Sequence, residues 1–98
     1  MNQEETVGIL KTFQNNIKNA IEQRSCHLDV DLEKLKRALE SLKLLYSDIE
    51  ELFEDIIYIV DNSLNTKLSS NKYIFNLASF DELNQKLMQV FTYIKGKI

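Results

Sequence analysis

A seven-residue repeat of apolar side chains runs unbroken from Leu32 to Val60 and constrains the fold more than any other feature. Apolar residues that recur at every third and fourth position form a stripe along one side of an α-helix. Three neighbouring registers of this repeat are apolar: Leu35, Leu42, Ile49 and Ile56; Ala38, Leu45, Leu52 and Ile59; and Leu32, Leu39, Tyr46, Phe53 and Val60. So wide a stripe predicts a helix that contacts two neighbouring helices rather than a bare two-stranded coiled coil.

The repeat predicts one long helix over about residues 31–63 as the spine of the fold. At 1.5 Å per residue, such a helix is roughly 50 Å long. The carboxylate of Asp29 or Asp31 could cap its first turn by accepting free backbone N–H groups. Residues 56–60 are apolar on every side and rich in β-branched side chains, which a short strand also favours. Because the repeat continues through Val60, we expect these residues to be helical.

Two further helices are expected to fold back along the spine. Asn2 followed by Glu5 forms the pattern of a capping box, and apolar spacing extends this first helix over about residues 3–25. Ser79 followed by Glu82 forms a second capping box at the start of a C-terminal helix. The sequence therefore predicts a helix before the spine and another after it.

The remaining features favour a helical fold in one domain. The chain has no Pro and only two Gly, which are the residues that mark turns and strand ends. Residues 61–70 form a polar break, and residues 72–78 could be a short helix or an ordered loop. We expect an all-α antiparallel helical bundle of three long helices, with or without a short fourth, built on the long central heptad helix. The whole of residues 1–98 would form this single domain.

Composition restricts the compartment and the chemistry. Cys26 is the only cysteine, so an internal disulfide is excluded. No apolar run approaches the ~18 residues that cross a bilayer, and the acidic, polar N-terminal residues do not resemble a signal peptide. These features predict a cytoplasmic protein that does not contact a membrane, with secretion by a route that needs no signal peptide as the alternative.

Charge changes sign along the predicted spine. Residues 31–47 carry three acids and four bases, whereas residues 48–66 carry six acids and no base. This order opposes the helix macrodipole, which favours acids at the start of a helix and bases at its end. The six acids are Asp48, Glu50, Glu51, Glu54, Asp55 and Asp61.

Four arrangements could accommodate these acids. A second copy of the helix could run antiparallel and place Lys34 near Asp55 of its twin. A basic partner protein could bind the acids, or they could simply be solvated. The lysines of the C-terminal third could instead lie against them within the chain; these are Lys72, Lys86, Lys95 and Lys97.

No catalytic, cofactor or metal site is predicted. Cys26 and His27 are adjacent, so their side chains point in different directions, whereas a thiol nucleophile and its base come from distant segments. One Cys and one His cannot form a structural zinc site. Lys34 occupies the position where a calcium-binding loop needs Gly, although four acids match that loop: Asp29, Asp31, Glu33 and Glu40.

The leading hypothesis is a non-enzymatic protein-interaction module, such as an adaptor, chaperone or inhibitor. It would bind a basic partner surface through the acidic segment 48–61. Phe53, Ile57 and Tyr58 would anchor the partner. Four carboxylates would orient the partner and speed its association: Asp48, Glu51, Glu54 and Asp55.

Two alternatives remain open. The long helix could drive self-assembly into a structural homodimer, in which the acids meet the bases of the twin helix. Alternatively, the Lys-rich C-terminal third could bind nucleic acid, although a net charge of −3 disfavours that partner. Aromatic residues are interleaved with these lysines: Tyr73, Phe75, Phe91 and Tyr93.

Overall fold

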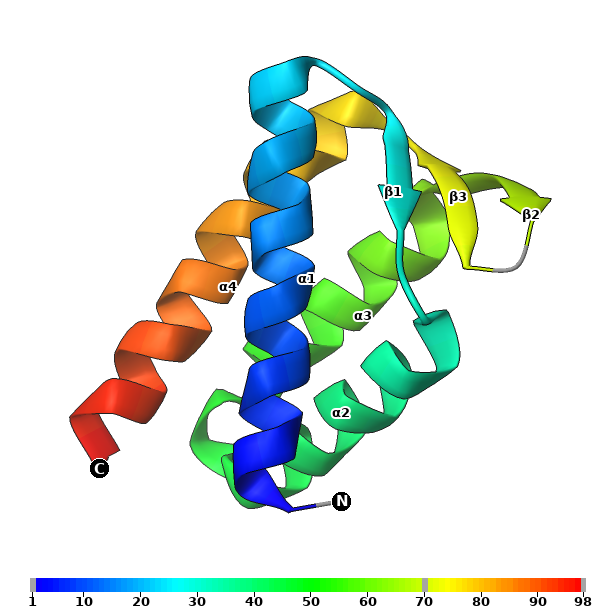
Figure 1. Ribbon diagram of the computed structural model, residues 1–98. Helices are drawn as coiled ribbons and strands as arrows, with labels where there is room; N and C mark the ends of the chain where they lie inside the picture. The colour runs from blue at the N-terminus through cyan, green and yellow to red at the C-terminus, as the bar shows by residue number, and fades with distance from the viewer. Residues whose placement is uncertain (1, 70, 98) are drawn as a thin grey trace.

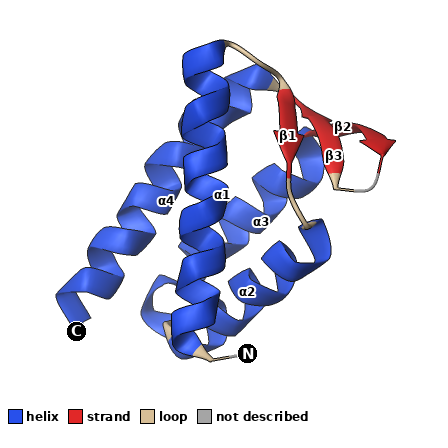
Figure 2. Ribbon diagram, viewed as in Figure 1, coloured by secondary structure: helices blue, strands red, loops and turns tan. Residues whose placement is uncertain are grey.

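Helices make up most of the molecule. The computed structural model describes residues 2–69 and 71–97, with residues 63–69 described as backbone only. Within these residues the chain forms four α-helices: α1 (Gln3–Gln23), α2 (Leu32–Leu45), α3 (Glu50–Ser63) and α4 (Leu77–Lys97) (Figure 1). It also forms three short strands: β1 (His27–Asp29), β2 (Leu64–Ser69) and β3 (Lys72–Phe75) (Figure 2). The predicted all-α bundle is confirmed. Its fourth helix is not short, since α1 and α4 have 21 residues each and α2 and α3 have 14 each.

The four helices form a ring in which each runs antiparallel to its neighbours (Figure 1). Helix α1 contacts α2 and α4, and α3 also contacts α2 and α4. This is the up-down-up-down arrangement of a four-helix bundle. Consequently the α1–α2 and α3–α4 connections lie at one end of the bundle, and the α2–α3 connection lies at the other.

The prediction of one long central helix was wrong. The chain leaves the helical conformation at Tyr46 (φ −115°, ψ 64°), passes through a 3-10 helix at Ser47–Ile49 and returns antiparallel as α3. The longest dimension of the molecule is 36 Å, shorter than the roughly 50 Å of the predicted helix. Folding back is favourable because it buries the apolar stripes of both halves against each other as well as against α1 and α4.

The helix ends follow from local hydrogen bonds. The side chain of Asn2 accepts a bond from the backbone N–H of Glu5 at 2.8 Å, so the first predicted capping residue is confirmed. Of the two candidate caps for α2, the structure uses Asp31. The predicted cap at Ser79 was wrong, because α4 begins at Leu77 and the side chain of Asn76 accepts the N–H of Ala78 at 3.1 Å.

The three strands close the end of the bundle where the two connections meet. Strand β3 lies between β1 and β2 and pairs antiparallel with both. Residues 72–75 are therefore a strand, which corrects the predicted choice between a short helix and a loop. Leu28 of β1 and Phe75 of β3 are buried against the helices, and the ring of Phe75 lies 5.6 Å from that of Phe80.

The core lies inside the ring of helices. Seven of the thirteen residues in the three heptad registers are buried in this core. The exceptions are Leu45, which is exposed, and five half-buried residues: Leu32, Tyr46, Ile49, Leu52 and Ile59. No helix in the described part of the chain is long and apolar enough to span a bilayer. Buried side chains from all four helices form the core: Leu10, Phe13, Ile17, Leu35, Leu39, Leu42, Phe53, Ile56, Val60, Leu83, Leu87 and Val90.

Candidate interaction surface on α3

The structure separates the seven predicted partner-binding residues by burial. Phe53 has no exposed surface and packs in the core, so it cannot contact a partner while the chain is folded; its assignment as an anchor is corrected. Ile57 is half-buried. Tyr58 keeps 69% of its surface exposed. The four predicted carboxylates are all on exposed residues: Asp48, Glu51, Glu54 and Asp55.

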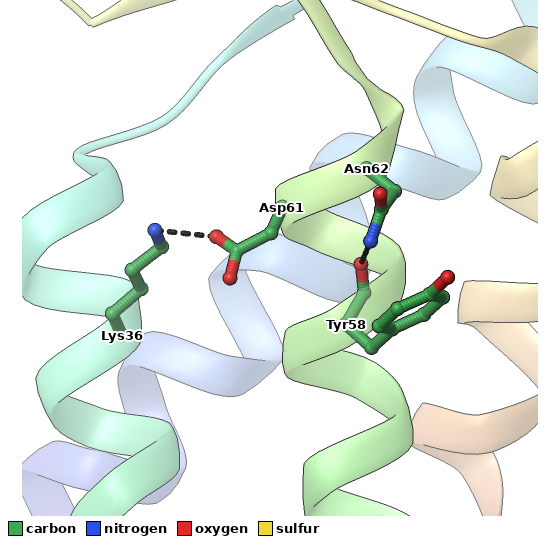
Figure 3. A network of polar contacts seen from close by, with 4 residues as sticks. All are labelled: Lys36, Tyr58, Asp61 and Asn62. Carbon is green, nitrogen blue, oxygen red and sulfur yellow. Dashed lines mark hydrogen bonds and ion pairs between the residues drawn. The ribbon is translucent and has the colours of Figure 1, made fainter.

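One side of α3 faces α2 and is occupied by ion pairs between the two helices. Lys43 Nζ lies 3.2 Å from Glu54 Oε1, and Lys36 Nζ lies 2.5 Å from Asp61 Oδ1 (Figure 3). Bases in the first half of the predicted long helix thus meet acids in its second half. A second, antiparallel copy of the helix could have made the same pairs, but here the chain makes them by folding back on itself. The order of these four charges was unfavourable for the dipole of one long helix, whereas in the hairpin they form two ion pairs between separate helices.

The other side of α3 and the 3-10 helix before it face α4, and two polar contacts bridge them to α4. Lys86 Nζ lies 3.5 Å from Asp55 Oδ2, and the hydroxyl of Tyr93 donates a 2.9 Å hydrogen bond to Asp48 Oδ2. Of the four C-terminal lysines proposed to meet the acids, Lys86 does so. Lys97 instead lies over the ring of Tyr93, 5.2 Å from its centroid.

Between these two sides, α3 presents an exposed stripe. Glu51, Asp55, Tyr58 and Asn62 follow one another at four- and three-residue spacing, so they share one face of the helix. We call these four residues the outer α3 stripe. Figure 3 shows the ring of Tyr58 projecting away from the Lys36–Asp61 pair, while the side-chain amide of Asn62 donates to the backbone carbonyl oxygen of Tyr58 at 2.8 Å. Sequence reasoning overlooked Asn62, although the same spacing would have placed it beside Tyr58.

Hydrogen bonds to two of these acids shift the pKa values of neighbouring side chains. The hydrogen bond to Glu54 raises the pKa of Lys43, and the charges of Glu40 and Glu50 act in the same direction. The hydrogen bond to Asp48 raises the pKa of Tyr93. Among the side chains that the structure describes, Glu50 and Glu51 form no ion pair, so the negative charge of this surface is only partly compensated internally.

The aromatic residues of the C-terminal third serve mainly the fold. Phe75 is buried, Tyr73 and Phe91 are half-buried against the core, and the Tyr93 hydroxyl is bonded to Asp48. Lys72 lies in the sheet, far along the bundle from Lys95 near the end of α4 (Figure 1). These residues do not form one basic surface lined with free aromatic rings. The described residues also hold no cluster of three His, Cys, Asp or Glu side chains suited to a metal ion.

Comparisons of the chain with protein-family models, with curated proteins and with solved structures gave no match. The features of the molecule that bear on function are therefore the outer α3 stripe and its surroundings.

Proposed function

We propose that this chain is a non-enzymatic protein-interaction module whose outer α3 stripe binds a basic surface of a partner protein. The observation that carries the proposal is the 69% exposure of Tyr58 in the middle of an acidic helix. Tyrosine is enriched at the energetic centres of protein interfaces, because its ring buries a large area and its hydroxyl can still hydrogen-bond. Glu51 and Asp55 on the same stripe would orient a basic partner around this anchor.

The ion pairs beside the stripe do not block such binding. Both partners of the Lys86–Asp55 pair are partly exposed, and pairs of this kind contribute about 0–1 kcal/mol. A partner base could therefore replace Lys86 at Asp55 with little loss of stability. Glu51, which forms no ion pair within the described chain, is accessible without any rearrangement.

The roles of Tyr58 and Phe53 can be separated by their effect on folding. Replacing the exposed Tyr58 with Ala should change the free energy of unfolding by less than about 0.5 kcal/mol. Replacing the buried Phe53 with Ala should destabilise the fold by about 3–5 kcal/mol, because it leaves a cavity in the core. Tyr58 variants can therefore report on binding without unfolding the protein, and Phe53 variants cannot.

The decisive experiment compares partner capture by matched variants. The wild-type chain is immobilised, a partner is captured from native cells and identified, and its affinity is measured by calorimetry. The double variant Glu51→Lys with Tyr58→Ser should weaken binding by at least about tenfold, since it removes the anchor and reverses a charge. The control Glu22→Lys makes the same charge change on an exposed position of α1 and should bind as the wild type does. Equal affinity of all three proteins would refute the proposal.

A further inference from the structure

A groove lies on the side of the molecule formed by α1, β1 and the first turn of α2. Its volume is about 500 Å³, within the range of roughly 300–1,000 Å³ that is usual for ligand pockets. Its apolar lining comes from two walls. Ile9 and Phe13 belong to α1, and Val30 and Leu35 belong to the connection after β1 and to α2. None of these residues belongs to the outer α3 stripe.

Gly8 borders this groove and is not explained by contacts within the chain. Its φ is not positive, and a Cβ atom placed there would meet nothing within 4 Å. Inside a helix, Gly is about 1 kcal/mol less favourable than Ala. The described fold therefore does not need a glycine at this position and is weakened by it. A glycine is useful where another molecule must approach the backbone closely, and Gly8 borders both this groove and a second one between α1 and α4.

Charge defines the chemistry that the groove could accept. Glu5 lies on the α1 wall, whereas Asp29 and Asp31 lie on the opposite wall with the single base Lys34. Three carboxylates against one ammonium leave the lining with a net charge of −2. Because carboxylates stand on both sides of an apolar floor, the fitting ligand has an apolar group with positive charges on either side of it.

We propose that this groove, which we call the Gly8 groove, binds a peptide segment of a partner protein in which an apolar side chain is flanked by Lys or Arg. The apolar side chain lies over Ile9 and Val30, and the backbone of the peptide passes close to Gly8. The flanking cations lie beside Glu5 on one wall and Asp29 on the other. This site is independent of the outer α3 stripe, and each can fail without the other.

The test follows backbone amide signals of the full chain by NMR while a short peptide of alternating leucine and arginine is added. The signals of Gly8, Ile9 and Val30 should shift and saturate. A peptide of the same length that alternates leucine with glutamate should leave them unchanged, since its charges repel the carboxylates. Shifts confined to the outer α3 stripe, or no shifts, would overturn the proposal.

Three variants make the assignment specific. Gly8→Leu places a side chain in the approach path, so affinity for the leucine–arginine peptide should fall at least tenfold while the melting temperature rises, because Leu is the better helix former. Asn15→Leu adds the same side chain at an exposed position of α1 that does not line the groove, and it should bind normally. The double variant Asp29→Asn with Asp31→Asn keeps a side-chain cap on α2 and should weaken binding by about fivefold. Unchanged affinity of Gly8→Leu would also overturn the proposal.

Discussion

Tyr93 joins three parts of the chain at the end of the bundle opposite the sheet. Its hydroxyl donates to Asp48 in the α2–α3 turn, and its ring meets that of Tyr46 edge-on with centroids 6.0 Å apart. Lys97 lies over the same ring, and the Tyr46 hydroxyl accepts a hydrogen bond from the side chain of Gln3. The start of α1, the turn and the last turn of α4 are thus connected through two phenol groups.

The Tyr93–Asp48 contact predicts a specific response to alkaline pH. The bond raises the pKa of Tyr93 above its ordinary value because it requires the protonated phenol. The stabilisation is therefore complete below the unfolded-state pKa of about 10 and is lost as pH rises through the higher folded-state pKa. Tyr93→Phe should be less stable than the wild type at neutral pH, and the difference should shrink above pH of about 10. Urea unfolding measured across this range checks the prediction; a difference that stayed constant with pH would contradict it.

Phe53 and Tyr58 show which part of the candidate surface the sequence could predict. Phe53 belongs to an apolar register of the heptad, so its burial followed from the repeat, and its assignment as a partner anchor conflicted with that pattern. Tyr58 lies off the repeat, and its exposure agrees with its position. The pairing of Lys43 with Glu54 was not predicted, because it depends on a turn that the apolar repeat does not reveal.

The α2–α3 hairpin explains why one uninterrupted repeat gives two helices. The turn uses neither Gly nor Pro: Tyr46 adopts a negative φ that any residue tolerates, and Ser47 and Asp48 are turn-forming residues. Each half of the repeat spans 14 residues and places its stripe in the core. The change from bases to acids along the repeat was the one sequence pattern that agreed with two helices, because bases before the turn and acids after it pair across an antiparallel hairpin.

Proline substitutions distinguish this hairpin from a continuous helix. Ser47 is the first residue of the 3-10 helix, where proline fits because its fixed φ is suitable and no intrahelical donor is lost. Ser47→Pro should therefore change the free energy of unfolding by less than about 1 kcal/mol. Ser41→Pro changes the same residue type in the middle of α2 and should destabilise the fold by about 3 kcal/mol or more. Chemical denaturation measures both, and equal losses would contradict the hairpin.

The small sheet was not predicted from the sequence, because its strands are short and their partners are distant in the chain. Strand β1 has three residues and β3 has four, too few to show a clear alternation of apolar and polar positions. Their pairing joins segments more than forty residues apart, His27 with Ile74, and such long-range contacts leave no local pattern. Only the buried positions Leu28 and Phe75 distinguish them from ordinary loops.

Contacts between distant segments hold the bundle together at both of its ends, and the apolar stripes of α2 and α3 are covered within the chain. The sheet joins the two connections at one end, and the Tyr46–Tyr93 contact joins three elements at the other. Helices α1 and α4 cover the stripes of α2 and α3, which a second copy would otherwise have covered. Helix α2 supplies within the chain the antiparallel bases that a second copy could have offered to the acidic segment, so neither the apolar stripes nor these acids require a homodimer.

The closed ring therefore predicts a monomer. Light scattering at micromolar concentration should give a mass near 11.5 kDa. The most exposed aliphatic side chains of the described surface are Leu44 and Leu45 on α2, with 83% and 55% of their areas exposed, and they offer the simplest route to self-association. Changing both to Glu should leave the mass and the melting temperature nearly unchanged, because neither side chain is buried in the core. A dimer that this double variant dissociates would instead show that α2 carries a self-association surface.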